Sequence, residues 1–157
     1  MKTMKKCAAM FLAVVMALSL AACGGAEKTV VLRGDMTDEM GIPTTDTFTL
    51  TAKGDIVQTI NEVFELDLSD YDDETKDHLI ASFDSFLLEP AKDIEGVECT
   101  GQMEGTTYTI ELTVDCTGTA VKEAAEAGIL AVDGSADIIS LKQTQSALEG
   151  QGYEVVE

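Results

Sequence analysis

The sequence predicts an α+β fold, with a single antiparallel sheet packed against two main helices. Apolar and polar side chains alternate over residues 47–52 and 107–115, which is typical of strands with one buried face. Apolar side chains recur at helical spacing over residues 72–87 and 140–149, in each case behind residues that cap helices. The order of these elements lacks the regular strand–helix alternation of a parallel sheet, and a length of 157 residues suits one domain.

The segment before the fold has the layout of an export signal. Three lysines precede an uncharged apolar run at 8–20, which is shorter than the ~20 residues of a membrane-spanning helix. Small residues and Cys23 follow, and this Leu-Ala-Ala-Cys sequence resembles the lipobox of bacterial lipoproteins. The resemblance implies that the Cys23 thiol carries a diacylglyceryl group and that cleavage leaves Cys23 as the N-terminus. The alternatives are an ordinary signal peptide cut nearby and a short core helix.

These features predict the domain organisation and the location. We expect a lipoprotein signal peptide at 1–22, a lipidated cysteine with a flexible tether at 23–27, and a single α+β domain at 28–157. The protein is expected at the bacterial cell membrane, anchored by acyl chains on Cys23 and facing outside the cytoplasm. Removing 22 residues, three of them lysines, leaves 135 residues with 29 acidic and seven basic side chains, a net charge of −22.

The domain is expected to open with two strands. Residues 29–33 are rich in β-branched side chains and predict a short strand. Residues 34–45 contain two glycines and a proline, and we interpret them as a loop of unknown role. Residues 47–52 form the alternating strand that follows.

A hairpin then joins this strand to the next one. A three-residue turn at 53–55 places Ile60 opposite Phe48 on the apolar face. Gln58 and Glu62 interrupt the apolar set of the following strand, which predicts a bulge or a partly exposed face.

The most acidic stretch, residues 67–77, is interpreted as the start of a helix. Ser69 or Asp70 is expected to cap the helix, because their side-chain oxygens can accept a hydrogen bond from a free backbone amide. The acidic side chains that follow would lie in the first turn, where the helix dipole favours negative charge. The helix is expected to end before Pro90. The alternative is a weak divalent-cation site, although the stretch lacks the glycine and the closing glutamate of a calcium loop. The candidate ligands for that alternative are Asp67, Asp70, Asp72 and Asp73.

Two cysteines of the exported domain lie in a predicted hairpin of strands 97–103 and 106–116. A tight turn places Cys99 opposite about Ile110, so that Cys116 lies six positions further along, ~20 Å away at the rise of a strand. A disulfide needs Cα atoms within ~7 Å. We therefore expect two buried free thiols, with a disulfide as the less favoured alternative.

The C-terminal part is expected to hold two helices and a last strand. Residues 119–127 are Ala-rich and predict a short helix, and 129–137 read as a loop. Ser140 and Gln143 form a capping box at the start of the second main helix, and 153–156 predict a short strand. The core is expected to comprise Phe48, Leu50, Ile60, Phe64, Leu79, Phe83, Phe86, Ile110, Leu112, Val114 and Leu148.

Three stretches of the sequence together resemble those of a known protein family. They are 52–58, 96–98 leading into 109–115, and 139–144 with the ending 152–156. With the lipobox, they resemble the YehR-like family of small bacterial lipoproteins, from about Phe48 to the end of the chain. This resemblance implies an exported, lipid-anchored α+β domain whose biochemical role is unassigned, so it carries over no catalytic or ligand-binding residue. The chain departs from the family pattern before Phe48 and in its excess of acidic side chains.

Composition limits the function classes. The 29 acidic against 10 basic side chains disfavour nucleic acid as a partner and adhesion of the domain itself to anionic lipid. The chain has no Cys-x-x-Cys motif and one histidine, His78, which is too few ligands for a zinc cage. No cofactor is expected.

The favoured function is a non-enzymatic envelope lipoprotein, a binding or accessory module for an unknown protein or small-molecule ligand. The anchor, the tether and the lack of a nucleophile–base motif favour it. A weak divalent-cation binder using 67–77, and a hydrolase using a carboxylate pair, are the alternatives. A concave site in the folded domain would discriminate among these hypotheses.

Overall fold

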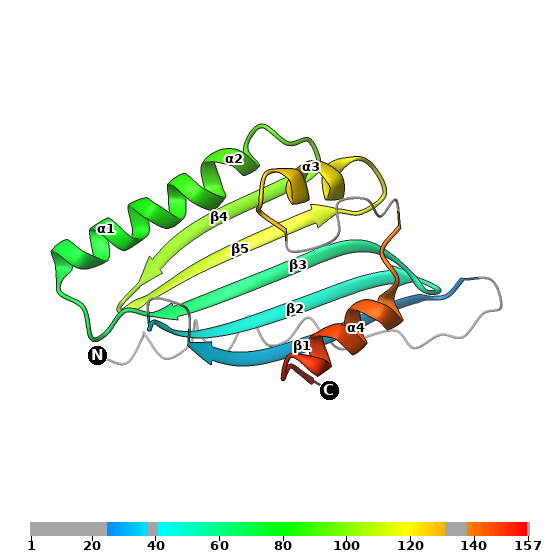
Figure 1. Cartoon of the computed structure of the whole chain (residues 1–157), viewed down its shortest axis with the longest axis horizontal. Coiled ribbons are helices and arrows are strands. Elements are labelled where there is room, and N and C mark those ends of the chain that lie inside the picture. Colours follow the sequence, from blue (N-terminus) through cyan, green and yellow to red (C-terminus); the bar gives the residue numbers. More distant parts are fainter. Residues whose placement is uncertain (1–24, 38–40, 131–137, 157) are drawn as a thin grey trace, which may run out of the picture.

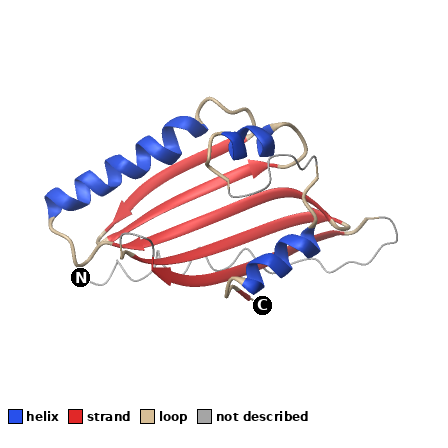
Figure 2. Cartoon of the chain, viewed as in Figure 1, coloured by secondary structure: helices blue, strands red, loops and turns tan. Residues whose placement is uncertain are grey.

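A six-stranded antiparallel sheet organises the domain (Figures 1 and 2). The structure is a computed structural model, and it describes residues 25–37, 41–130 and 138–156. The strands lie in the order β4-β5-β3-β2-β1-β6, and every paired neighbour is antiparallel. Their bounds are β1 (Glu27–Thr37), β2 (Pro43–Lys53), β3 (Ile56–Asp67), β4 (Val97–Glu104), β5 (Thr107–Asp115) and β6 (Glu154–Val155). The α+β class and the single antiparallel sheet predicted from the sequence are confirmed.

The helices pack on the face of the sheet that carries the apolar side chains. One continuous helical stretch, α1 (Asp73–Phe83), η1 (Asp84–Leu88) and α2 (Glu89–Ala91), runs along β4, whereas α4 (Leu141–Gly150) runs along β1 (Figure 1). A further short helix, α3 (Ala120–Glu126), packs against β5. The structure therefore has more helical segments than the two main helices expected from the sequence.

The loop expected at 34–45 is mostly strand, which corrects the sequence-based interpretation. β1 continues to Thr37 and β2 begins at Pro43, the first position of a strand, where proline is tolerated. Gly34 pairs with Asp46 within this ladder, and the ring of Tyr153 covers it so closely that a Cβ there would lie 3.0 Å from Cδ1 of the ring. At the other end, β1 starts at Glu27, inside the segment expected as a tether.

The register of β2 against β3 differs from the expected one. Gly54 and Asp55 form a two-residue turn, and a bulge follows at the step between Thr51 and Ala52. The bulge was one of the two expectations for this strand, but its position makes the pairing of Ile60 with Phe48 wrong. Ile60 lies opposite Leu50, and Glu62 lies opposite Phe48. Glu62 therefore projects from the face that the helices cover.

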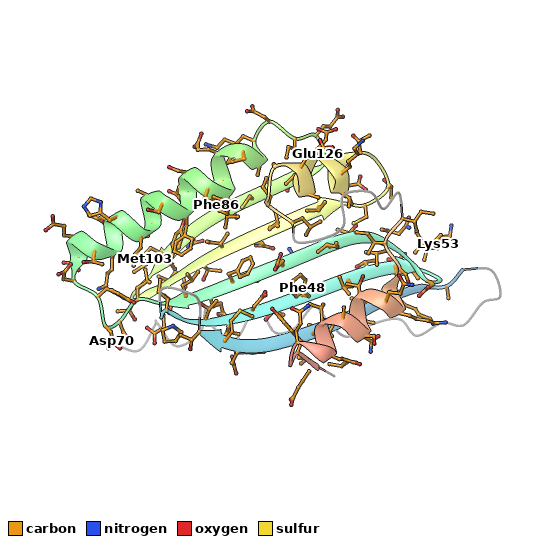
Figure 3. All side chains as sticks on the ribbon, in the orientation of Figure 1. Phe48, Lys53, Asp70, Phe86, Met103 and Glu126 are labelled. Atoms are coloured by element: carbon orange, nitrogen blue, oxygen red, sulfur yellow. The ribbon has the colours of Figure 1, made fainter. Side chains whose placement is uncertain are left out.

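The first helix continues past Pro90, contrary to expectation. In η1 the Glu89 amide donates to the Asp84 carbonyl, five residues back, so Pro90 enters at the start of the short α2 instead of breaking the helix. The turn of η1 contains more residues than an α-helical turn, so it shifts the directions in which the side chains point. Leu88 packs against the core and Phe86 is 64% exposed, so the prediction of Phe86 in the core is wrong (Figure 3).

The turn between β4 and β5 lies one residue later in the sequence than expected. Gly105, with a φ of +63°, and Thr106 form a two-residue turn, so Cys99 pairs with Leu112 rather than Ile110. Cys116 then lies four positions further along instead of six, still ~13 Å away at the rise of a strand. The structure has both cysteines as free thiols.

The core forms two clusters between the sheet and the helices that cover one of its faces. Leu50, Ile60, Ile110, Leu112, Val114 and Leu148 are buried as expected, whereas Phe48, Phe64, Leu79 and Phe83 are partly buried. Leu32 of β1 and Tyr153 near the C-terminus join the cluster beneath α4, although the sequence analysis did not select them.

Candidate functional site

A pocket of about 300 Å³ lies between α4 and the centre of the sheet. Its floor is formed by side chains of β2 and β3, namely Phe48, Leu50, Ile60 and Glu62. Its walls are formed by Leu130, Ile138, Ile139, Ser140, Gln143, Thr144, Ala147, Leu148 and Gln151. Phe48 lies on the part of the sheet between α4 and the helices over β4 and β5 (Figure 3). A mainly apolar cavity with a few polar groups is the usual form of a small-molecule site.

The N-terminus of α4 is tied to the turn between β2 and β3. The Asp55 carboxylate accepts hydrogen bonds from the Ser140 hydroxyl (2.8 Å) and the Lys142 amide (3.0 Å), and these bonds lower the Asp55 pKa, the Lys142 amide contributing most. The Ser140 side chain also accepts from the Gln143 amide (3.3 Å), as the capping box predicts. Backbone bonds join the same two segments, with the Leu141 amide donating to the Asp55 carbonyl at 2.8 Å.

The C-terminal end of α4 is tied to β1. The Tyr153 amide donates to the Leu148 carbonyl (3.1 Å), and β6 then pairs with Leu32 and Arg33 of β1. The helix is thus held at both ends, and the pocket lies beneath its middle.

Glu62 is the one ionisable side chain among the described residues that line the pocket. It is 7% exposed, and no hydrogen bond to its carboxyl group is found among the described residues. Burial, and then the charge of Asp46, raise its pKa to about 9. At neutral pH the empty pocket therefore holds a protonated Glu62.

Asp46 lies diagonally from Glu62 on the same face, in the pair two positions further along β2 and β3. It is 2% exposed, and its Oδ2 accepts a hydrogen bond from the Tyr153 hydroxyl at 2.6 Å. Its Oδ1 has no hydrogen-bond partner within the described part of the chain. Burial raises the Asp46 pKa to about 6, although the Tyr153 hydrogen bond acts in the opposite direction. The Tyr153 ring meets Phe48 edge-on with centroids 5.5 Å apart, which connects this pair to the pocket floor.

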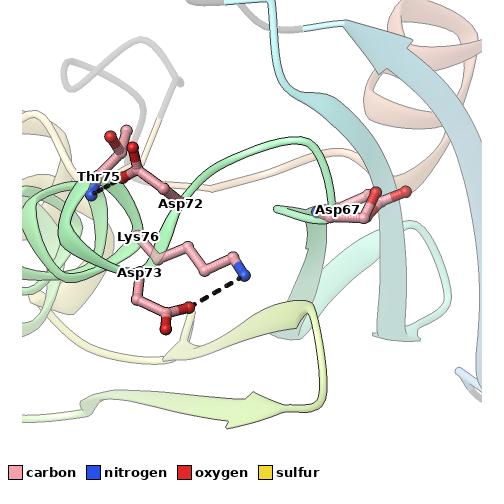
Figure 4. A network of polar contacts seen from close by, with 6 residues as sticks. Asp67, Asp72, Asp73, Thr75 and Lys76 are labelled. Atoms are coloured by element: carbon pink, nitrogen blue, oxygen red, sulfur yellow. Dashed lines mark hydrogen bonds and ion pairs between the residues drawn. The ribbon is translucent and has the colours of Figure 1, made fainter.

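The acidic stretch 67–77 is spread over a turn and a helix start (Figure 4). The cap is Asp72, not Ser69 or Asp70 as expected, and its Oδ1 accepts from the Thr75 amide at 2.8 Å. The remaining candidate cation ligands have separate surroundings: Asp67 accepts from the Ser69 amide at 2.9 Å, Asp73 pairs with Lys76 at 3.6 Å, and Asp70 is exposed. Across residues 25–37, 41–130 and 138–156, no group of three or more His, Cys, Asp or Glu is placed to hold a metal ion.

The cysteines contribute no reactive group to the pocket. Burial raises the pKa of Cys99 and of Cys116 to about 11 each, so both thiols stay protonated at neutral pH. The Cys116 thiol donates to the Val114 carbonyl at 3.6 Å. Cys23, the predicted lipidation site, lies outside the described residues, as do 131–137 of the predicted loop.

The chemistry of the pocket is that of a binding site with one proton-exchanging group. Glu62 can donate a hydrogen bond when protonated or pair with a cation when ionised. The Ser140 hydroxyl, which also lines the pocket, is engaged with Asp55, and His78 is exposed on α1.

Sequence reasoning missed Glu62, Asp46 and Tyr153 as site residues. Glu62 had a signal, because it stands two residues from both Ile60 and Phe64 and so shares their face in a regular strand. Asp46 had none, since it fell at the edge of a segment interpreted as a loop.

Comparisons with known proteins identify relatives whose function is also open. Residues 37–154 match the model of a family described as "Protein of unknown function (DUF1307)". The NMR structure of Escherichia coli YehR protein superposes with a TM-score of 0.66 at 19% identity, covering 85% of this chain and 93% of that one.

An NMR structure of a protein from Streptococcus pneumoniae TIGR4 has a TM-score of 0.62 at 13% identity, covering 90% of this chain and 92% of that one. At these identities the likeness shows the fold. No curated protein matches the chain. No helix within the described residues is long and apolar enough to cross a membrane.

Proposed function

The chain belongs to the DUF1307 family, as its resemblance to YehR-like proteins predicts, and we propose that it is a lipid-anchored envelope lipoprotein whose domain binds a small ligand. In this proposal the domain is a non-enzymatic binding module. Acyl chains on Cys23 hold it at the bacterial cell membrane, outside the cytoplasm.

One observation carries the binding role: the cavity of about 300 Å³ under α4, with an apolar floor and a buried carboxyl group. Large side chains such as Phe48 and Leu50 form this floor, and α4 is braced at both ends so that the cavity stays open. A preformed cavity lowers the cost of ordering the protein when a ligand binds.

The start of the fold supports the anchor. The Gly54 amide donates to the Ala26 carbonyl at 3.1 Å, so the chain joins the domain three residues after Cys23, at the turn between β2 and β3. Three residues span at most ~11 Å. This turn would therefore stand close to the bilayer, together with the N-terminus of α4 that Asp55 holds.

Anchoring is tested by Cys23→Ala in the full chain. The variant should leave the membrane fraction, because the acyl chains lose their attachment point. A Cys23→Ala protein that still sediments with membranes would show that the lipobox interpretation is wrong or that a second anchor exists.

Ligand binding is tested with a neutral apolar fluorescent probe, N-phenyl-1-naphthylamine. Thr144→Phe places a ring into the pocket, and Ser146→Phe places the same ring on an exposed position of α4 outside the pocket lining. The wild type and Ser146→Phe should enhance the fluorescence of the probe, whereas Thr144→Phe should not. Equal enhancement by both folded variants would place the probe elsewhere and count against the pocket.

A further inference from the structure

Two buried carboxyl groups lie side by side on the helix-covered face of the sheet. Asp46 of β2 pairs with Phe64 and Glu62 of β3 pairs with Phe48, so the two acids are diagonal neighbours across adjacent strands. They are 2% and 7% exposed. After burial itself, the charge of Asp46 adds to the cost of ionising Glu62, because like charges in a poorly solvated site repel.

No basic side chain compensates them within the described part of the chain. The pocket lining contains no Lys, Arg or His, and the ion pairs found among the described residues join Lys76, Lys92 and Lys122 to acids of their own helical segments. The Tyr153 hydroxyl donates its hydrogen bond to Asp46. Glu62 lines the cavity, and its carboxyl group has no hydrogen-bond partner among the described residues. A buried charge that is left unpaired is strongly disfavoured.

We propose that the pocket takes a small organic cation, with an ammonium group next to the Glu62 carboxylate and an apolar body against Phe48, Leu50 and Ile60. This inference rests on the proposed binding function and names the chemical class of the ligand. The ammonium supplies the positive charge that the site lacks, while the apolar floor buries the hydrocarbon part. A bare metal ion fits the site poorly, because the floor offers it a single carboxylate among apolar groups.

Binding is coupled to the loss of a proton. In the empty pocket Glu62 is protonated at neutral pH, because its pKa is about 9. When the ammonium binds, the Glu62 O–H bond breaks and the proton passes to solvent, so the ligand's charge replaces that of the proton. At pH values below 9, the affinity for the ammonium should therefore rise about tenfold for each unit by which the pH increases.

Among the described residues, the other ionisable groups near Glu62 titrate outside a window of pH 7 to 8.5. Asp46 on β2 has a pKa of about 6, and Cys99 on β4 has a pKa of about 11. Burial raises the pKa of Tyr153, which follows α4, above its usual value of 10. The α4 side chains that line the pocket are uncharged. A pH effect on ligand affinity in this window thus reports Glu62.

The test compares hexylammonium with 1-hexanol, which has the same hydrocarbon chain and no charge. NMR titrations in 150 mM sodium chloride at pH 7 and pH 8 give the dissociation constants. Calorimetry in two buffers of different ionisation enthalpy gives the number of protons released. We expect hexylammonium to bind at least tenfold more tightly than 1-hexanol at pH 8, to gain about tenfold from pH 7 to pH 8, and to release one proton.

Two variants separate the pocket from the general acidity of the domain. Glu62→Gln should lose the preference for hexylammonium while it keeps 1-hexanol binding. Glu65→Gln makes the same substitution at an exposed position of β3 and should behave as the wild type. Proton release by the wild type needs no variant, so the inference stays testable if Glu62→Gln does not fold.

The possible outcomes distinguish the proposal of a cationic ligand from the proposed binding function on which it rests. Equal binding of the two probes, no proton release, or an unchanged preference in folded Glu62→Gln would overturn the cationic ligand and leave apolar binding in place. Failure of the wild type to bind hexylammonium, 1-hexanol and the fluorescent probe alike would overturn the binding function itself.

Discussion

Replacing Glu62 by Gln should stabilise the domain, by an amount that depends on pH. The folded pKa of Glu62 is about 9, against 4.5 in the unfolded chain. Because folding raises this pKa, the favourable contribution is complete below pH 4.5 and is lost as the pH rises toward 9. The unfolded chain gains by ionising Glu62 over this range, while the folded domain keeps it protonated.

The magnitude follows from the size of the pKa change. Each pH unit between 4.5 and 9 costs about 1.4 kcal/mol, so the penalty reaches roughly 3 kcal/mol at pH 7. Gln has nearly the same shape and carries no ionisable proton, so Glu62→Gln avoids this penalty. For a domain of this size a gain of ~3 kcal/mol corresponds to an increase in the melting temperature of roughly 10 °C.

Thermal unfolding followed by circular dichroism at pH 5, 7 and 8 measures the effect. The gain of Glu62→Gln over the wild type should be small at pH 5 and should grow with pH. Glu65→Gln is the matched control, since it makes the same substitution at an exposed site of the same strand. The reasoning is refuted if Glu62→Gln destabilises the domain at pH 7, or if its gain equals that of Glu65→Gln at every pH.

Three further predictions address the hydrogen bonds, the thiols and the acidic stretch. Tyr153→Phe should cost about 1–3 kcal/mol in chemical denaturation, because Asp46 loses the donor to its buried Oδ2, and an unchanged midpoint would contradict this. Cys99 and Cys116 should both react with a thiol label in denaturant, whereas a mass 2 Da lower without labelling would reveal a disulfide. Millimolar calcium should raise the melting temperature no more than sodium chloride of equal ionic strength, while Asp72→Ala should lower the melting temperature by removing the helix cap. A saturable effect of micromolar calcium would instead favour a cation site.

Local patterns predicted much of the fold because their causes are local. The capping box of Ser140 and Gln143 places the start of α4 correctly, since a cap depends on residues three apart. The alternation in β5 identifies its buried face, because side chains of a strand point to opposite faces in turn. The sequence could thus supply the fold class, the single sheet and part of the core.

The helix after Asp72 shows where a local rule was overridden. Proline normally ends a helix, but a π turn from Asp84 to Leu88 shifts the hydrogen bonds so that Pro90 fits. The same turn moves Phe86 out to solvent and packs the partly buried Leu88 against the core. Helical spacing measured at 3.6 residues per turn cannot anticipate such a shift.

The candidate site was decided by the tertiary structure. Glu62 faces the pocket because a bulge and a two-residue turn set the register of β3, and a change of one residue would turn it to the opposite face. Asp46 meets Tyr153 across 107 positions of sequence, a contact that exists after the sheet has formed and the C-terminus has returned to β1. By itself the sequence determined the elements and their apolar faces, since these depend on neighbouring residues. The sheet register and the path of the chain decided which acids are buried together, because burial depends on what packs above a side chain.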